Sequence, residues 1–164
     1  MMTGKIVSLE EMRALREELA SRGKRLVMTN GCFDLLHVGH LGCLKEARQR
    51  GDLLVVGLND DGSTRRVKGP GRPLMVQEDR AELLAALECV DYVVIFSEST
   101  AERLVRVLKP DIYVKGGDYR VDELPEARAV AEYGGEIHLS PLTPGRSTSD
   151  LITTIVARHR GTEQ

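Results

Sequence analysis

Two histidines three positions apart, His37 and His40, mark the part of the chain whose residue types best suit phosphate chemistry. They lie in the segment Asn30–His40, directly after the apolar run 25–29, so we expect a buried strand that leads through a turn into a helix. Small residues at such a turn let backbone N–H groups approach an anion, and the helix start adds a favourable dipole. The predicted polyphosphate-binding residues of this segment are Gly31, Cys32, Phe33, His37, Gly39 and His40.

Two other interpretations of the histidine pair stand beside phosphate chemistry. The spacing of His37 and His40 can place two metal ligands together, but zinc needs a third protein ligand, and no motif in the sequence supplies one. The pair can also cap a helix or pack in the core. The segment is neither the G-x-x-x-x-G-K-[ST] phosphate loop nor the G-x-G-x-x-G fingerprint, and neither pattern occurs elsewhere. Taking the segment as a whole, we favour phosphate chemistry and expect no metal site formed by the protein.

A cluster of basic residues follows the second predicted strand. Taken alone, Arg65, Arg66 and Lys68 would indicate a solvated loop. Their position beyond the end of a strand, where a ligand is expected, favours phosphate contacts for Lys68 and Arg66. Arg80 lies near the start of a predicted helix, where the dipole disfavours a cation, and this misfit favours an anion contact.

Two glycine-containing loops are further candidates. In Lys115–Asp118 the glycines would let the backbone approach a ring or a ribose, while a tight turn explains the same residues equally well. In Gly145–Asp150 the alternative to a second phosphate-binding helix start is a plain N-cap. The predicted contacts from these loops are Lys115, Gly117, Asp118, Gly145, Arg146, Ser147, Thr148 and Ser149.

The composition limits the classes of function. A length of 164 residues suits one domain, 1–164, and 41% hydrophobic with 29% charged residues is ordinary for a soluble protein. A net charge of −2 and 4% aromatic residues argue against nucleic-acid binding. The sequence lacks a membrane-span pattern and a signal-peptide pattern, so we expect no membrane association and a cytoplasmic location. Cys32, Cys43 and Cys89 are odd in number and widely spaced, which indicates reduced thiols.

Strand-like and helix-like segments alternate along the chain. An N-terminal helix is expected over about 8–22, where Ser8–Glu11 has a capping-box pattern, and the core is expected over about 25–159. The predicted strands are 25–30, 53–58, 92–96, 112–114 and 137–139. The further predicted helices are 39–50, 78–88, 101–108, 125–133 and 149–159.

The predicted strands are short continuous apolar runs, which is typical of parallel strands covered on both faces. Their alternation with helices predicts an α/β fold, a doubly wound, Rossmann-like, five-stranded parallel sheet with helices on both faces. In such sheets ligands bind beyond the carboxyl ends of the strands. The loops expected there are 31–40, 59–73, 115–120 and 140–149.

These residues resemble the HxGH nucleotidyltransferase superfamily, which includes cytidylyltransferases and phosphopantetheine adenylyltransferase. Within it, the chain is most similar to the adenylyltransferase domain of the bifunctional heptose 7-phosphate kinase/heptose 1-phosphate adenylyltransferase of ADP-heptose synthesis. The similarity runs from about Lys5 to Ile155. The matching pieces are Thr29–His40, Val67–Gly69, Ala85–Glu88, Val114–Tyr119 and Gly145–Thr148. The HxGH pattern indicates only the superfamily, whereas Cys32 together with Lys115–Asp118 indicates the heptose branch.

The resemblance implies transfer of AMP from ATP to D-glycero-β-D-manno-heptose 1-phosphate, giving ADP-heptose and pyrophosphate, with Mg²⁺ held mainly through the triphosphate. An oxygen of the sugar phosphate attacks the α-phosphorus in line, and no covalent enzyme intermediate is expected. Catalysis then depends on positioning and on stabilisation of charge.

The resemblance also implies roles for individual residues. His37 and His40 contact the triphosphate and the transition state, and Lys68 neutralises developing charge. Ser147 and Thr148 hold the outgoing pyrophosphate. The residues assigned to the sugar-phosphate side are Asp34, Arg66 and Arg80.

The chain departs from the family pattern at two positions. Ser149 stands where many relatives carry a second threonine. Leu142 stands where cytidylyltransferases carry an arginine, and this weakens the case for a cytidine nucleotide as the substrate. The alternatives are a cytidylyltransferase acting on glycerol 3-phosphate or a related small phosphate, and a non-catalytic nucleotide-binding module. The sequence lacks the sugar-kinase half, so a separate sugar kinase would supply the acceptor, and the resemblance suggests a homo-oligomer, a dimer or larger.

Overall fold

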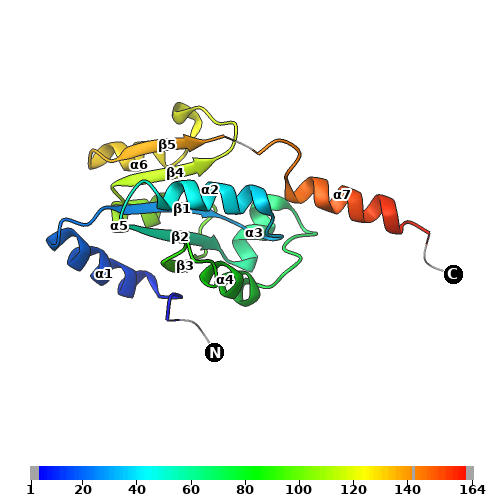
Figure 1. Cartoon of the computed structure of the whole chain (residues 1–164), viewed down its shortest axis with the longest axis horizontal. Helices are drawn as coiled ribbons and strands as arrows, with labels where there is room; N and C mark the ends of the chain where they lie inside the picture. Colours follow the sequence, from blue (N-terminus) through cyan, green and yellow to red (C-terminus); the bar gives the residue numbers. More distant parts are fainter. Residues whose placement is uncertain (1–3, 142, 162–164) are drawn as a thin grey trace.

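The computed structural model describes residues 4–141 and 143–161. Strands alternate with helical segments along the chain, and the strands form one sheet with helices around it (Figure 1). The strands are β1 (Leu26–Gly31), β2 (Leu53–Asn59), β3 (Tyr92–Phe96), β4 (Ile112–Gly116) and β5 (Glu136–Ser140). The helices are α1 (Leu9–Ser21), α2 (Val38–Arg48), α3 (Asp61–Lys68), α4 (Gln77–Ala85), α5 (Glu102–Leu108), α6 (Ala127–Glu132), α7 (Thr148–His159) and the short 3₁₀ helix η1 (Val121–Glu123).

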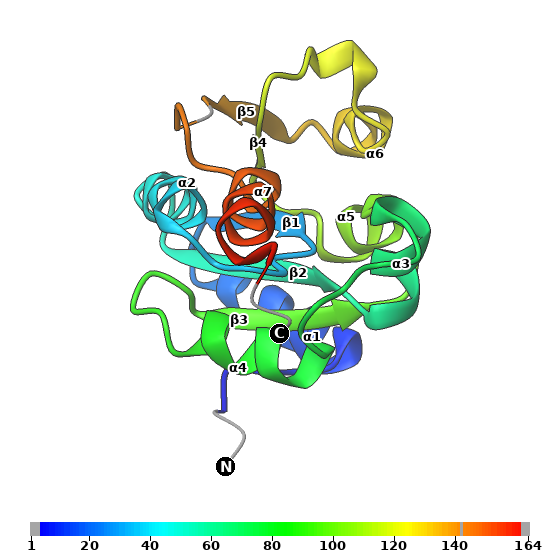
Figure 2. The same cartoon turned by 90° about the vertical axis from the view of Figure 1, so that its right-hand side faces the viewer.

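The sheet has five parallel strands in the order β3-β2-β1-β4-β5. Figure 2 shows the strands in this order, with α2 on one side and α5 and α6 on the other. The predicted doubly wound parallel sheet is therefore confirmed. Because β1 pairs with both β2 and β4, the strand order reverses beside β1, and a crevice is expected beyond the carboxyl ends of β1 and β4.

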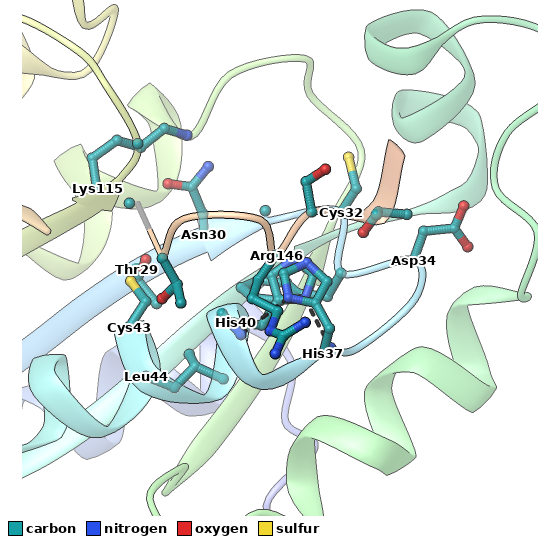
Figure 3. A pocket seen from close by; sticks show the side chains of 18 of the residues that line it. Thr29, Asn30, Cys32, Asp34, His37, His40, Cys43, Leu44, Lys115 and Arg146 are labelled. Atoms are coloured by element: carbon teal, nitrogen blue, oxygen red, sulfur yellow. Dashed lines mark hydrogen bonds between the residues drawn. The ribbon is translucent and has the colours of Figure 1, made fainter. Parts of the chain in front are cut away.

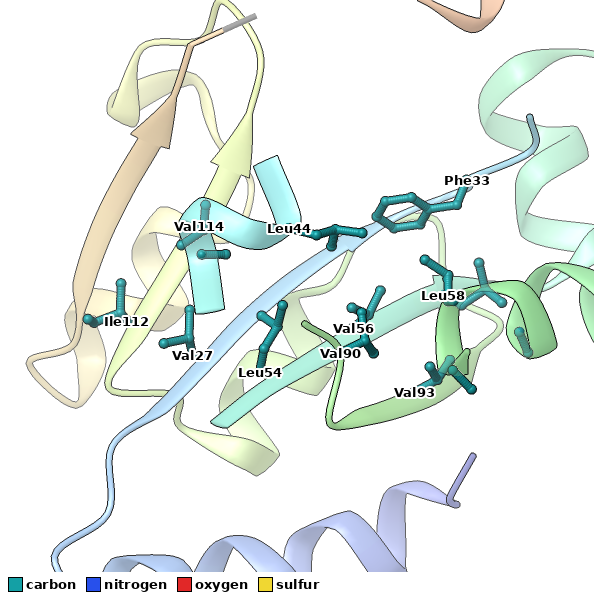
Figure 4. Close-up of a cluster of buried hydrophobic side chains, with 14 residues drawn as sticks. Val27, Phe33, Leu44, Leu54, Val56, Leu58, Val90, Val93, Ile112 and Val114 are labelled. Carbon is teal, nitrogen blue, oxygen red and sulfur yellow. The ribbon is translucent and has the colours of Figure 1, made fainter. Parts of the chain in front are cut away.

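Each face of the sheet carries its own hydrophobic cluster, because neighbouring residues on a strand point to opposite faces. Val27 and Val56 pack with Leu44 of α2 and Leu84 of α4 on one face (Figure 4). Met28, Val55 and Tyr113 belong to the cluster on the other face, which α1, α5 and α6 cover. Burial on both faces explains why the strands are continuous apolar runs.

One segment predicted as a loop is a helix. Residues 59–73 were expected to be a loop, but Asp61–Lys68 forms α3, and the Asp60 carboxylate caps it by accepting the Ser63 N–H at 2.7 Å. The buried residues of α3 are Ser63 and Thr64, so the helix packs through small polar side chains. The sequence therefore lacks the apolar periodicity by which a helix is usually predicted.

Helix α7 extends away from the sheet (Figure 1). None of its residues is buried, and Leu151, Ile155 and Val156 are exposed apolar side chains. A helix of this length gains little stability in isolation, so packing of its apolar side normally stabilises it. Among the described residues, no helix combines the length and the apolar character that crossing a membrane requires.

Candidate active site

A pocket of about 350 Å³ lies at the carboxyl ends of β1 and β4, where the strand order reverses (Figure 3). Four segments far apart in the sequence line it: the end of β1 with the start of α2, the α3–α4 connection, the end of β4, and the start of α7. The predicted residues that line it are Gly31, Cys32, Phe33, Asp34, His37, Gly39, His40, Lys68, Lys115, Gly117, Arg146, Ser147, Thr148 and Ser149.

His37 and His40 lie side by side at the start of α2. Their rings stack with centroids 3.9 Å apart and an interplanar angle of 28°. The Gly39 N–H donates to Nδ1 of His37 at 3.1 Å, and the His37 N–H donates to Nδ1 of His40 at 3.4 Å. Because each Nδ1 accepts a backbone hydrogen bond, the proton of each neutral ring lies on Nε2. The pair therefore caps the helix and keeps two Nε2–H donors for a ligand.

The glycine between the histidines has a steric role. A Cβ on Gly39 would lie 2.9 Å from Nδ1 and Cε1 of His37 and 3.2 Å from the carbonyl oxygen of Arg146. Real Cβ atoms essentially never approach as closely as 2.9 Å, and 3.2 Å is tighter than most contacts, so a side chain at position 39 would displace the His37 ring and press on the 143–148 loop. The loop and the helix together form one wall of the pocket.

Both histidines are held in the neutral form. Burial, together with the nearby His37 and Lys68 side chains, lowers the pKa of His40 to about 4. Burial and the Arg146 guanidinium lower the pKa of His37. The positive surroundings that disfavour a charged imidazole also favour a bound polyanion. At neutral pH the pair therefore offers uncharged donors in a positive pocket.

The start of α7 brings hydroxyl groups to the same pocket. Ser147 is the N-cap and its Oγ accepts the Asp150 N–H at 3.0 Å, while the Thr148 hydroxyl donates to the Leu35 carbonyl at 3.2 Å. The sequence left open a plain N-cap or a phosphate-binding helix start. The structure shows that the helix start with the Ser147 cap also lines the pocket. Gly145 lies in the turn before the helix with φ of +68° and is absent from the residues that line the pocket.

The end of β4 forms the opposite side of the pocket from Asp34 (Figure 3). Lys115 and Gly117 line it, and the Lys115 ammonium lies 5.7 Å from the centre of the Tyr119 ring. Gly117 has φ of +133°, and a Cβ there would lie 2.5 Å from that ring. Asp118 is exposed and does not line the pocket.

Two predicted phosphate ligands have structural partners instead. Arg66 lies outside the pocket lining and donates to the Ser97 carbonyl and the Ser99 hydroxyl. Arg80 is 1% exposed and donates to the carbonyls of Cys32, Asn59 and Met75 and to the Asp61 carboxylate. The cation near the start of α4 is thus explained by the buried carbonyls that it satisfies.

Several residues that line the pocket did not emerge from the sequence. They are Thr29, Asn30, Cys43, Leu44, Arg72, Tyr119, Pro141 and Thr143, whereas Gly116 belongs to the glycine-containing loop that the sequence did indicate. Arg72 lay within the loop expected over 59–73, and Asn30 lay inside the matching segment, both without an assigned role. Leu142, on which the argument against cytidine depended, lies outside the described residues.

The described residues of the pocket offer few ligands for a metal ion. Magnesium takes oxygen ligands, and Asp34 is the one carboxylate among the described lining residues. That carboxylate already accepts from Arg72 and from the N–H groups of Leu74 and Met75. No group of three or more His, Cys, Asp or Glu residues in the described ranges could hold a metal ion.

The positive, donor-rich pocket at the reversal of a parallel sheet defines a nucleotide-binding enzyme site of the HxGH type. The cytidylyltransferase-like family model matches residues 28–154, and the chain belongs to this family. The prediction of a nucleotidyltransferase from the sequence is confirmed at this level.

The curated relatives point to a narrower group. The chain is 52% identical over 155 residues to the bifunctional protein HldE of Syntrophotalea carbinolica, covering 94% of this chain and 32% of that protein. It is 49% identical over 152 residues to the bifunctional protein HldE of Geobacter sulfurreducens, covering 93% of this chain and 31% of that protein. The chain thus spans about a third of the length of these relatives.

Solved structures agree on the fold. The lipopolysaccharide core biosynthesis protein from Thermoplasma volcanium superimposes with a TM-score of 0.60 at 30% identity, covering 74% of this chain and 98% of that chain. Pantoate-beta-alanine ligase from Francisella tularensis superimposes with a TM-score of 0.62 at 15% identity, covering 88% of this chain and 68% of that chain. At that identity the second similarity concerns the fold alone.

Proposed function

We propose that this chain transfers AMP from ATP to D-glycero-β-D-manno-heptose 1-phosphate, giving ADP-heptose and pyrophosphate. The observation that carries the proposal is the stacked pair of neutral histidines, His37 and His40, in a pocket lined by cationic side chains. The similarity to HldE proteins over almost the whole chain supports the choice of acceptor.

In the proposed reaction, an oxygen of the sugar phosphate forms a bond to the α-phosphorus of ATP, and the bond from that phosphorus to the β-phosphate oxygen breaks. Pyrophosphate leaves on the opposite side. The Nε2–H groups of His37 and His40 donate to phosphate oxygens, and Lys68 neutralises charge on the α-phosphate as it develops. The reaction needs no covalent intermediate, so the protein contributes position and electrostatic stabilisation.

The start of α7 is assigned to the leaving group. The hydroxyl groups of Ser147, Thr148 and Ser149 line the pocket beside the Arg146 side chain, and the helix dipole favours an anion there. At the other side, the end of β4 with Lys115 and Gly117 is assigned to the base and the ribose. Gly145 and Asp118 lie near these contacts in sequence, and we keep them as weaker candidates.

Magnesium is proposed to enter with the triphosphate, whose oxygens would be its main ligands. When it is bound, it neutralises part of the phosphate charge. This chain's own residues supply the remaining positive charge, from Lys68, Lys115 and Arg146.

The test is pyrophosphate release measured with ATP and with CTP, each combined with heptose 1-phosphate and with glycerol 3-phosphate. We expect ATP with heptose 1-phosphate to give the highest kcat/KM. A preference for CTP with glycerol 3-phosphate would establish the cytidylyltransferase alternative instead. Nucleotide binding without turnover of any acceptor would show that the chain is a non-catalytic nucleotide-binding module.

The proposed partners follow from the substrates. A sugar kinase must produce the 1-phosphate acceptor, and we propose that it acts immediately upstream of this chain. We also propose that the chain forms a homodimer or a larger homo-oligomer, because the apolar side of α7 is exposed on a single copy. A cytoplasmic location stays a prediction.

A further inference from the structure

Arg72 is a pocket residue that the proposed function has not used. It lies in the connection between α3 and α4, and its side chain is 17% exposed where it lines the pocket. Its Nε donates to Oδ2 of Asp34 at 2.6 Å. In the described part of the chain its terminal nitrogens, Nη1 and Nη2, have no hydrogen-bond partner. The guanidinium is therefore anchored at one edge while its two terminal groups stay available.

The Asp34 carboxylate that holds Arg72 is itself held in place by backbone hydrogen bonds. The Asp34 carboxylate is fully buried and accepts the Leu74 N–H at 2.9 Å and the Met75 N–H at 3.0 Å. Burial raises the pKa of Asp34, but the hydrogen bonds from Leu74, Arg72 and Met75 outweigh it, so the pKa lies below its ordinary value. An ionised carboxylate with these hydrogen bonds fixes the direction of the Arg72 side chain. Its oxygens are already occupied by the hydrogen bonds that they accept, so they are not free to bind the sugar phosphate.

The other parts of the pocket already have proposed occupants. The triphosphate is assigned to the histidine pair and the start of α7, and the base and ribose are assigned to the end of β4. Among the residues that line the pocket, Asp34 and Arg72 have no assigned substrate. The Arg72 side chain supplies the hydrogen-bond donors of this pair. Its free donors are cationic, and a guanidinium offers two parallel N–H groups that match the oxygens of a phosphate.

We propose that Arg72 binds the phosphate of the acceptor, a sugar 1-phosphate, through Nη1 and Nη2. The inference rests on the proposed function, since it assigns the second substrate of that reaction. In this position Arg72 holds the acceptor phosphate so that one oxygen faces the α-phosphorus, while Lys68, which lines the same pocket, neutralises charge on the α-phosphate. Asp34 is then a positioning residue that acts through Arg72 rather than a ligand of the sugar phosphate.

The experiment is a steady-state comparison of Arg72→Ala and Arg72→Lys with the wild type, varying ATP and the sugar 1-phosphate separately. A hydrogen bond to a charged group contributes about 1.5–3 kcal/mol, so the KM for the acceptor should rise ~10- to 150-fold in Arg72→Ala. The KM for ATP should stay within about twofold, because no nucleotide contact is removed. Arg72→Lys should recover only part of the affinity, since an ammonium lacks the two-pronged geometry.

The control variant is Arg65→Ala, which removes the same charge from an exposed position on α3 outside the pocket lining. It should leave both KM values unchanged. Calorimetric titration of the sugar 1-phosphate into protein saturated with a non-hydrolysable ATP analogue gives a second readout that does not depend on turnover. The Arg72 variants should lose acceptor affinity there too, while the thermal unfolding midpoint shows that the pocket remains folded.

The possible outcomes separate the two proposals. Wild-type turnover with a sugar 1-phosphate, combined with an unchanged acceptor KM in Arg72→Ala, overturns the role of Arg72 and leaves the function intact. An equal rise of both KM values shows that Arg72 only supports the loop, and this also overturns the proposal. Absence of wild-type turnover with every sugar 1-phosphate overturns the proposed function and the inference together.

Discussion

The chemistry at His37 and His40 depends on keeping two imidazoles neutral beside several cations. Their Nδ1 atoms are occupied by backbone N–H groups, so each ring presents its proton on Nε2 toward the pocket. A neutral donor costs less to bury than a charged one, and it still strengthens as negative charge builds up on a phosphate oxygen. The pair therefore suits a transition state that is more negative at those oxygens than the ground state.

Replacing His40 with alanine should lower kcat strongly without unfolding the protein. Loss of one preorganised donor typically lowers kcat ~100- to 1,000-fold. The matched control is His138→Ala, because His138 lies outside the pocket and pairs with Glu46 at 2.7 Å. Initial rates of pyrophosphate release and circular dichroism check both variants. A near-normal rate in folded His40→Ala would contradict the catalytic role.

The lowered pKa of His40 predicts how stability changes with pH. In the folded protein the pKa is about 4, against an ordinary value of 6.5, so between these values the unfolded chain binds more protons. The contribution of neutral His40 to the free energy of unfolding is therefore fully present above pH 6.5. It falls as the pH is lowered toward 4, by up to ~3 kcal/mol.

Urea unfolding of the wild type and of His40→Gln between pH 7.5 and 4.5 measures this effect. The variant should show a shallower loss, while His37, whose pKa is also lowered, keeps part of the dependence. Asp34 contributes at lower pH, because its pKa lies below 3.8 and its stabilisation is lost as the pH falls through that folded value. Parallel curves for the two proteins would show that His40 is not buried as a neutral base.

At the scale of elements, the start of α2 is where local and tertiary requirements conflict. Helix propensity alone favours alanine over glycine by about 1 kcal/mol inside a helix. A Cβ on Gly39 would nevertheless collide with the His37 ring and press tightly on the Arg146 carbonyl, whereas a Cβ on Gly42 would lie 4.0 Å from its nearest neighbour, the Thr143 hydroxyl. The two glycines of one helix thus give a matched pair.

Gly42→Ala should raise stability by about 0.5–1 kcal/mol and leave kcat/KM unchanged. Gly39→Ala should lower kcat by on the order of 100-fold, because displacement of a catalytic group by about 1 Å has that effect. Thermal unfolding and pyrophosphate release distinguish the two variants. Equal activity of both would mean that the helix start tolerates movement of the His37 ring.

The start of α7 combines a cap with a proposed phosphate contact, and two substitutions at Ser147 separate these roles. Ser147→Ala removes the hydrogen bond to the Asp150 N–H and should cost about 1 kcal/mol of local helix stability. Ser147→Asp keeps a good cap but places a negative charge beside the triphosphate. We expect the KM for ATP to rise more in Ser147→Asp than in Ser147→Ala. The reverse order would assign Ser147 to the cap alone.

Elements were predictable where burial leaves a one-dimensional pattern. The strands are buried on both faces and read as continuous apolar runs, and the sheet followed from them. Helix α3 was missed because it packs through Ser63 and Thr64, which leave no apolar period. Arg80 was interpreted from the helix dipole, but its partners are carbonyls of Cys32 and Asn59, distant in sequence. Contacts of that kind are set by tertiary structure, which a local pattern does not contain.

At the scale of the molecule, the reversal of strand order explains why the site lies where it does. Strands β1 and β4 are neighbours in the sheet, yet their following segments lead to α2 and to the loop before η1. The pocket lies where these two segments diverge, and residues 143 and 146–149, at and before the start of α7, form part of its lining. The position of α7 therefore affects the phosphate side of the pocket as well as the outer surface.

The exposed side of α7 and the exposed side of α4 have complementary chemistry. Ile155 and Val156 on α7 are 52% and 43% exposed, and the exposed Arg158 and Arg160 lie near its end. At α4, Leu83 is exposed beside the acidic residues Glu78, Asp79 and Glu82. Because both surfaces are present on every copy, a twofold arrangement could pair them reciprocally. This complementarity supports a second copy of the chain as the partner of α7.

Ile155→Glu tests that arrangement against Thr153→Glu, which adds the same charge to an exposed position on a different side of α7. Light scattering coupled to gel filtration over a range of concentrations should show a wild-type dimer. Loss of a buried isoleucine contact should weaken its association by at least ~10-fold in Ile155→Glu. Thr153→Glu should dimerise normally. A wild type that stays monomeric at all concentrations, or equal association of both variants, would mean that α7 does not pack against a second copy.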